Sequence, residues 1–128
     1  ISEEAWPKCG EIDIMEHINN EDIIYGTIHS EQYNHMTDTQ IGGNIEIKNL
    51  DSKFYTFGLE WNEDALVWFI DNEIYHRVNK LDHFKSGWPF DKNYFLIINQ
   101  ALGGFWPGNP DENFKSSEFI IDWIKIYQ

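Results

Sequence analysis

Hydrophobic and polar residues alternate in short runs along most of this 128-residue chain. Runs rich in Ile, Phe, Tyr, Trp and Val are separated by clusters of Asn, Asp, Gly and Pro, a pattern typical of strands joined by turns. Eight strands are predicted, at about 10–18, 23–30, 44–48, 53–62, 64–70, 73–78, 93–101 and 118–127. The pattern therefore predicts an all-β protein, an antiparallel β-sandwich with jelly-roll topology.

Two short polar segments predict tight turns in the middle of the chain. The segments 62–64 and 71–72 each separate two apolar runs, so residues 53–78 are predicted to form a meander of hairpins. Within 54–61, one alternating set of positions is entirely apolar and the other is mixed, which indicates a strand with one face packed between two sheets. Residues 81–93 are the one stretch that can hold a helical turn, and we expect mainly a loop there.

The segment before residue 17 combines apolar and carboxylate side chains in one predicted strand. Side chains alternate in a regular strand, so Glu11 and Asp13 share one face while Glu16 points to the other. One extra residue, a β-bulge near Ile14-Met15, returns Glu16 to the face that carries the other two carboxylates. The sequence then predicts two glutamates, on either side of an aspartate, on the same surface of a sheet.

Such a group of carboxylates suits acid–base and nucleophilic chemistry on a sugar. With the bulge absorbed, the Cα atoms of Glu11 and Glu16 lie about four strand steps apart, roughly 13 Å at ~3.3 Å per residue. Side chains that lean together can reach the ~5–5.5 Å carboxyl separation of retaining glycosidases, whereas inverting enzymes need ~6.5–9.5 Å. Crowding raises at least one carboxyl pKa, as a general acid near neutral pH requires. The alternative interpretation is a solvated acidic strand face in an acidic protein.

Composition and charge narrow the classes of partner. Aromatic residues make up 16% of the chain, more than the packing of a small domain demands, and a sugar-binding cleft would use some of these rings for stacking. The net charge of −13 argues against nucleic acid and an anionic membrane surface, and is compatible with a neutral glucan. Cys9, the one cysteine, has no partner for an internal disulfide. The sequence shows no signal-peptide pattern and no apolar run long enough to span a bilayer.

Residues 10–16, Gly-Glu-Ile-Asp-Ile-Met-Glu, resemble the signature of glycoside hydrolase family 16, in the bulged form of laminarinase-like endo-β-1,3-glucanases. Further stretches resemble the family in the same order, at 6–9, 26–29, 54–61, 95–108 and 121–128. The resemblance implies a concanavalin A-like jelly roll, with residues 1–128 forming the C-terminal portion of a single catalytic domain. Family domains are longer and carry the motif near their middle. We therefore expect a fragment, a processed product or one part of a nicked or two-chain enzyme.

An absent N-terminal half has a physical consequence. Half a sandwich leaves a long hydrophobic sheet edge and an uncovered face, both of which favour aggregation. We therefore expect a complementary N-terminal polypeptide, or a second copy of the chain, to cover them. The resemblance also implies a secreted, extracellular protein, because laminarinase-like enzymes act on extracellular glucans.

The resemblance implies roles for the carboxylates in retaining endo-hydrolysis of β-1,3-glucan. Glu11 corresponds to the nucleophile that forms a glycosyl-enzyme intermediate, and Glu16 corresponds to the acid/base. Asp13 is expected to hydrogen-bond one glutamate and to modulate the pKa of both, in a coupled titration. No cofactor is required for this catalysis. Asp122 matches a position that helps to bind a structural calcium in many relatives, with backbone carbonyls of the missing half completing the site.

Five further residues are candidates for binding the polysaccharide, namely Trp6, His29, Asn99, Gln100 and Trp106. The resemblance implies that His29 faces the carboxylates from the neighbouring strand, although a lone histidine at a strand end is more often a surface residue. Asn99 and Gln100 lie on a strand expected to cross the cleft, where an amide can bond hydroxyl groups in both directions. Trp106, in a glycine-flanked loop, is a candidate stacking platform. Trp6 either lines the cleft from the opposite side or belongs to the core.

Two alternative functions fit the same residues. One is hydrolysis of mixed-linkage β-glucan, or of another polysaccharide such as a galactan, by an enzyme of the same family. The bulged motif weighs against the unbulged lichenases, and the loop at 103–108 weighs against agarases. The other alternative is a non-catalytic β-glucan-binding module, although such relatives typically lack the paired glutamates.

Overall fold

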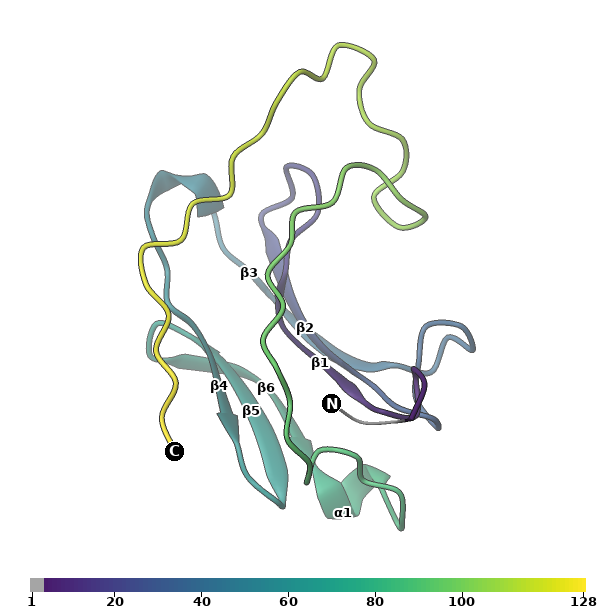
Figure 1. The fold of residues 1–128 in the computed structure, drawn as a ribbon. Helices are drawn as coiled ribbons and strands as arrows, with labels where there is room; N and C mark the ends of the chain where they lie inside the picture. The colour runs from purple at the N-terminus through teal and green to yellow at the C-terminus, as the bar shows by residue number, and fades with distance from the viewer. Residues whose placement is uncertain (1–3) are drawn as a thin grey trace. The chain divides into compact units, whose positions relative to one another are not determined.

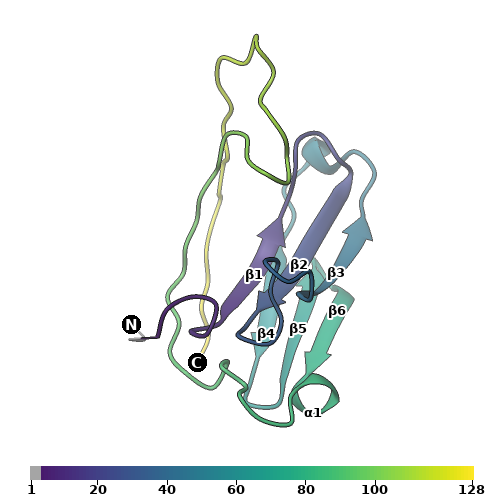
Figure 2. The ribbon, with the colours of Figure 1, turned by 90° about the vertical axis from the view of Figure 1, so that its right-hand side faces the viewer.

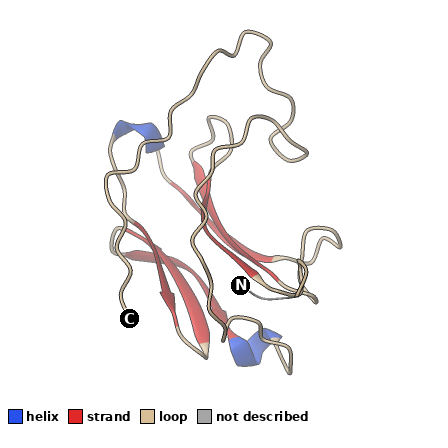
Figure 3. Ribbon diagram, in the orientation of Figure 1, coloured by secondary structure: helices blue, strands red, loops and turns tan. Residues whose placement is uncertain are grey.

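The computed structural model describes residues 4–128, which form two units, the first ending at Phe95 and the second running from Leu96 to Gln128. The first unit contains two antiparallel three-stranded sheets, with the orders β1-β2-β3 and β4-β5-β6 (Figure 1, Figure 3). The strands are β1 (Glu11–Glu16), β2 (Ile23–His29), β3 (Ile41–Glu46), β4 (Phe57–Trp61), β5 (Ala65–Ile70) and β6 (Glu73–Asn79). Two short helices accompany them, the 3-10 helix η1 (Leu50–Ser52) and α1 (Lys80–His83). No helix within residues 4–128 is long and apolar enough to cross a membrane.

The two sheets of the first unit pack against each other, β3 on β6 and β1 on β4 (Figure 2). Their inner faces enclose an apolar core that also takes up the aromatic residues following α1. The buried members of this core are Ile28, Leu66, Trp68, Val78, Phe84, Trp88 and Phe90. The antiparallel sandwich predicted from the alternating pattern is therefore confirmed, and the outer face of the β1–β2–β3 sheet is left for polar side chains.

Asn62 and Asp71 build the two hairpin turns of the second sheet. Asn62 Oδ1 accepts a hydrogen bond from the backbone N–H of Asp64 at 2.9 Å. Asp71 has φ +50, and its carboxylate accepts the N–H of Thr56 at 3.0 Å. Side chains of this kind bond nearby backbone groups and tolerate left-handed backbone, which makes them good turn residues. The meander predicted over residues 53–78 is confirmed.

Two strands begin three or four residues away from the predicted position. β3 begins at Ile41 rather than at residue 44, because Gly42 and Gly43 interrupt the apolar pattern without interrupting the strand. A side chain at position 43 would lie 2.5 Å from the ring of His76, so glycine permits this close approach between the sheets. β4 begins at Phe57 rather than at residue 53.

The predicted strands at 93–101 and 118–127 are wrong for this structure. Both stretches are irregular, and residues 96–128 contain no strand or helix, only an isolated bridge between Gly104 and Gly108. A strand requires a neighbour for its backbone hydrogen bonds, and neither stretch is paired within the described chain. Their apolar side chains are correspondingly exposed, Ile97 by 68% and Ile126 by 75%. The helical turn allowed for residues 81–93 is present as α1, followed by a loop.

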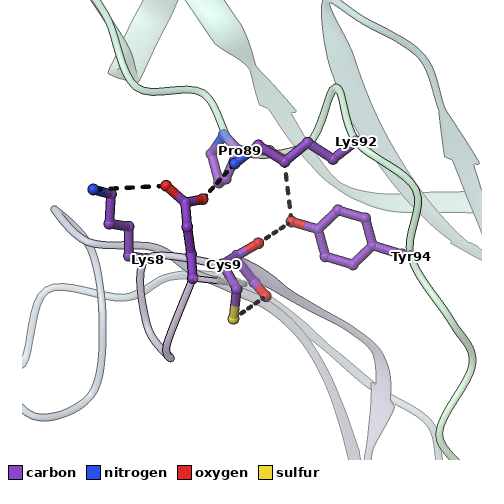
Figure 4. A network of polar contacts seen from close by, with 7 residues as sticks. Lys8, Cys9, Pro89, Lys92 and Tyr94 are labelled. Carbon is purple, nitrogen blue, oxygen red and sulfur yellow. Dashed lines mark hydrogen bonds and ion pairs between the residues drawn. The ribbon is translucent and has the colours of Figure 1, made fainter. Parts of the chain in front are cut away.

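The chain entering β1 is tied to the loop at residues 89–94 (Figure 4). The hydroxyl of Tyr94 donates a hydrogen bond to the carbonyl oxygen of Cys9 at 2.9 Å. Gly10 follows with φ +81, and a Cβ there would lie 2.1 Å from the Tyr94 hydroxyl. Glycine is therefore required immediately before Glu11. In the same network, ion pairs join Glu4 to Lys8 and to Lys92.

Candidate active site

A β-bulge in β1 brings the three carboxylates to one face, as predicted. Asp13 pairs with Thr27 and Glu16 pairs with Tyr25, so two residues of β1 stand opposite Gly26 alone. The extra residue reverses the alternation between Asp13 and Glu16. Glu11 pairs with His29 farther along the same ladder. The site is thus built on two adjacent strands rather than on loops, which fixes the backbone that carries the carboxylates.

Each glutamate accepts a hydrogen bond from a different neighbour. The indole Nε1 of Trp6 donates to Oε2 of Glu11. The hydroxyl of Thr27 donates to Oε2 of Glu16 at 3.1 Å. Both carboxyl groups are half-buried. Their orientations are therefore held before any ligand binds.

Burial and mutual repulsion raise the pKa values of both glutamates. The pKa of Glu16 is raised to about 7, mainly by burial and next by the negative charge of Asp13. The hydrogen bond from the Thr27 hydroxyl lowers this pKa in part. The same two causes raise the pKa of Glu11, which the N–H of Trp6 lowers in turn. Because the groups interact, their protons are lost in coupled steps. One of the two carboxyls therefore holds its proton close to neutral pH.

His29 completes the polar face from β2. Its Nε2 lies 3.3 Å from Oδ2 of Asp13, and the side chain is buried with 7% exposed. Burial by itself would lower the pKa of His29, but the carboxylates of Asp13, Glu11 and Glu16 outweigh it and raise that pKa. The crowded carboxylates thus favour the protonated form of the His29 imidazole. The prediction that His29 faces the carboxylates agrees with this geometry.

Three rings gather beside Glu11. Trp6 lies with its ring centroid 4.9 Å from that of His35 and 6.0 Å from that of His29. His35 and His29 make an edge-on contact at 5.1 Å. The sequence predicts Trp6 and His29 in the site but not His35, which belongs to no motif. His35 follows the buried Asn34, whose amide donates to the carbonyl of Ser30 at 3.1 Å and folds the loop back.

Thr27 is a second residue that the motif alone did not identify as part of the site. The sequence does carry a signal for it, because Thr27 and His29 have the same parity on β2 and therefore share a face.

The remaining predicted binding residues lie in residues 96–128, a unit described on its own. Asn99 is exposed, and Gln100 Nε2 donates to the hydroxyl of Ser117 at 2.9 Å. Trp106 is 55% exposed in a loop closed by reciprocal backbone hydrogen bonds between Gly104 and Gly108, at 3.0 and 3.1 Å. The binding role of these three residues stays a prediction.

Asp122, the predicted calcium ligand, is an exposed residue of the same unit. Across residues 4–128, no group of three or more His, Cys, Asp or Glu side chains is arranged to hold a metal ion. Asp122 by itself supplies one carboxylate, whereas calcium takes six to eight oxygen ligands. A structural calcium stays a prediction.

Two carboxyl groups lie side by side on a rigid sheet surface. The one that holds its proton can protonate a leaving group, and the ionised one can attack an electrophilic carbon. This combination is what the hydrolysis of a glycosidic bond requires. The carboxylate face needs no metal ion for such chemistry, because proton transfer and nucleophilic attack are both supplied by side chains.

Comparison with known proteins places the chain in a family. The chain is 36% identical over 131 residues to the "Beta-glucanase" of Rhodothermus marinus, an alignment covering 96% of this chain and 46% of that protein. It is 32% identical over 135 residues to a "Glucan endo-1,3-beta-glucosidase" of Cryptopygus antarcticus, covering 94% and 50%. The chain thus spans about half the length of these curated relatives.

A solved structure gives the same result at the level of the fold. The laminarinase catalytic domain of Thermotoga maritima superposes with a TM-score of 0.78 at 39% identity, over 86% of this chain and 46% of that one. The predicted fold class is confirmed by this similarity. The family profile described as "Glycosyl hydrolases family 16" matches residues 1–125. With nearly the whole chain inside that match, the protein belongs to glycosyl hydrolase family 16.

Proposed function

We propose that this chain carries the catalytic carboxylates of a retaining endo-β-1,3-glucanase that acts on laminarin-type glucan. The observation that supports it is the bulge of β1, which gathers Glu11, Asp13 and Glu16 on one face and leaves Glu16 with a pKa of about 7. The relatives named as a glucan endo-1,3-beta-glucosidase and a laminarinase point to the same substrate class. Because the chain spans about half of such relatives, the proposed activity is that of the assembled protein.

In the first step, the carboxylate of Glu11 attacks the anomeric carbon while the bond to the leaving oxygen breaks. Glu16 gives its proton to that oxygen, so the departing sugar leaves as a neutral alcohol. The raised pKa of Glu16 suits this role, because an ordinary glutamate is ionised at neutral pH. The Trp6 N–H orients the attacking carboxylate.

In the second step, Glu16 acts as a base. Its carboxylate takes a proton from a water molecule whose oxygen attacks the anomeric carbon and releases Glu11. Once Glu11 is esterified, one negative charge is gone from the cluster, and Glu16 loses its proton more readily. Asp13, whose Oδ2 lies 3.3 Å from Nε2 of His29, raises the pKa of both glutamates.

The remaining predicted features complete the proposal. Asn99, Gln100 and Trp106 would bind sugar units, and Asp122 would bind a structural calcium. We further propose an extracellular site of action. A complementary N-terminal polypeptide, or a second copy, would cover the exposed apolar residues of 96–128, since exposed apolar side chains favour association.

The proposal is tested on the active protein by release of reducing ends from laminarin. Glu11→Gln and Glu16→Gln should each lower kcat by at least about 10³-fold, since either change removes a reacting group. Glu60→Gln is the matched control, because Glu60 is an exposed glutamate of β4. NMR of the first products should show retained β-configuration at the anomeric carbon. Wild-type-like hydrolysis by Glu11→Gln would overturn the assignment.

Two further measurements separate the alternatives. A panel of laminarin, mixed-linkage glucan and agarose distinguishes β-1,3-glucan from other substrates of the family. Binding of laminarin without any release of reducing ends would instead favour a glucan-binding module.

A further inference from the structure

The bulge on which the proposed function rests meets a residue of the facing sheet. Trp68, in the middle of β5, is fully buried, with 0% of its surface exposed. Its indole Nε1 donates a hydrogen bond to the backbone carbonyl of Asp13 at 2.9 Å. Asp13 is the last residue of β1 before the register breaks. The core of the sandwich thus makes a directed polar contact at the beginning of the bulge.

A bulge disrupts the ladder and leaves backbone groups without their regular partners. A buried carbonyl without a donor destabilises its conformation by about 1–3 kcal/mol. The indole N–H of Trp68 supplies a donor to the carbonyl of Asp13, the residue after which the register breaks. A regular pairing in this register would place Glu16 on the inner face, so stabilising the bulge also stabilises the outward position of the Glu16 side chain.

Gly26 makes room for this contact. It is the residue of β2 that stands opposite two residues of β1 at the bulge. A Cβ on Gly26 would lie 2.5 Å from Cδ1 of Trp68 and 2.8 Å from its Nε1. Such distances are far inside ordinary carbon contacts, so any side chain at position 26 would displace the indole from the Asp13 carbonyl. The hydrogen bond from Trp68 to the Asp13 carbonyl therefore depends on glycine at position 26.

We propose that Trp68 is a positioning residue for the acid/base Glu16: its indole N–H holds the bulge of β1 in register, and Gly26 provides the space for it. This inference rests on the proposed function for the role of Glu16. The hydrogen bond of Trp68 goes to a backbone carbonyl, so Trp68 acts through the backbone of β1.

Tyr75 of β6 provides a matched control at the same level of the core. A Cβ on Gly26 would lie 2.7 Å from its hydroxyl, so Tyr75 approaches the same glycine as Trp68 does. Its hydroxyl is buried and has no hydrogen-bond partner among the described residues. Tyr75→Phe therefore removes a polar atom beneath the bulge without removing a bond to it.

The experiment compares Trp68→Phe with Tyr75→Phe in the active protein, first without substrate. Hydrogen exchange of the amides of residues 14–16 should accelerate by about tenfold in Trp68→Phe, because one hydrogen bond that closes the bulge is lost. Exchange in β4–β6 should change little. The pKa of Glu16, followed by ¹³C NMR of its carboxyl, should fall, since a looser bulge admits water to a group whose pKa is raised chiefly by burial. Tyr75→Phe should leave both readouts within error of wild type.

The other groups that face Glu16 must be followed in the same titration. They are Glu11 and Asp13 on β1, Thr27 and His29 on β2, and Tyr75 on β6. With laminarin, Trp68→Phe should lower kcat by about 10–100-fold and leave KM nearly unchanged, as expected for a misplaced reacting group.

A second variant guards against a misfolded Trp68→Phe protein. Replacement of Trp68 by benzothienylalanine keeps the bicyclic shape and substitutes sulfur for the N–H. Its bulge amides and Glu16 pKa should change as in Trp68→Phe. A folded benzothienylalanine protein with wild-type exchange and wild-type Glu16 pKa would overturn the inference, as would exchange that accelerates uniformly across both sheets. Because these readouts need no substrate, a failure of laminarin cleavage in the wild type would reject the proposed function alone.

Discussion

The hydroxyl of Thr27 reaches Oε2 of Glu16 at 3.1 Å although Thr27 stands opposite Asp13 in the ladder. The contact exists because the bulge returns Glu16 to the face of the sheet on which Thr27 lies. It favours the ionised carboxylate and opposes the burial that raises the Glu16 pKa to about 7. Thr27 therefore sets how far above its ordinary value that pKa lies.

Thr27→Val should raise the pKa of Glu16 further, because the variant keeps the branched shape and removes the donor. A hydrogen bond to a charged group contributes about 1.5–3 kcal/mol, so a partly solvated one should shift the alkaline limb of kcat/KM upward by about one pH unit. Thr27→Ser, which keeps the hydroxyl, is the control. An alkaline limb that stays in place for Thr27→Val would show that this contact does not tune Glu16.

The pH profile of the wild type follows from the two glutamates. Glu16 must hold its proton to act as the acid, so kcat/KM should fall as the pH rises above about 7. Glu11 must be ionised to attack, and its pKa is raised by burial and by Asp13, so the acidic limb should lie above the ordinary glutamate value of 4.5. Initial rates on laminarin between pH 4 and pH 9 measure both limbs. Full activity at pH 9 would contradict the assignment of Glu16 as the acid.

Folding stability should respond to Glu16 in a defined direction. A carboxyl whose pKa is raised on folding is favoured by the folded state when protonated, so its stabilising effect is lost as the pH rises from about 4.5 to about 7. After discounting for partial solvent exposure, the loss is on the order of 2 kcal/mol. Urea unfolding of wild type and Glu16→Gln over this range should give curves that diverge, with the variant relatively more stable at pH 7. Parallel curves would contradict the raised pKa.

Much of the carboxylate site could be predicted because its signal is local. The alternation of residues 11–16 fixes which side chains share a face, and the bulge is the one irregularity that unites the three carboxylates. His35 could not be found in this way. Its contacts with Trp6 and His29 depend on how the loop after β2 folds back.

The strands predicted at 93–101 and 118–127 show what a local sequence pattern cannot predict. Apolar, β-branched sequence is typical of strands, yet both stretches are irregular. Becoming a strand also requires a hydrogen-bonding neighbour, which no local pattern supplies. The start of β3 is missed for a related reason. Glycine has a low strand propensity, but Gly43 lies in β3 because it permits a close approach to the facing sheet.

Gly10→Ala should destabilise the protein by about 2–4 kcal/mol, from backbone strain at φ +81 together with overpacking against Tyr94. Thermal unfolding measures the loss. Tyr94→Phe removes the hydroxyl that a Cβ would meet at 2.1 Å, so the double variant Gly10→Ala, Tyr94→Phe should recover part of the stability relative to the sum of the single changes. Strict additivity of the two changes would show that the Tyr94 hydroxyl is not the obstacle.

The last prediction concerns what completes the sandwich. The intact mass of every polypeptide in an active, purified sample should show the 15.2 kDa chain together with a second polypeptide, or a native mass corresponding to more than one copy. The reason is the exposed apolar side chains of residues 96–128, which are stabilised by being covered. Denaturing mass spectrometry identifies a second polypeptide, and native mass spectrometry of the same sample counts copies. If a lone 15.2 kDa monomer cleaves laminarin, no complement is needed and this part of the proposal is wrong. If the lone chain binds laminarin without cleaving it, the glucan-binding function is favoured over hydrolysis.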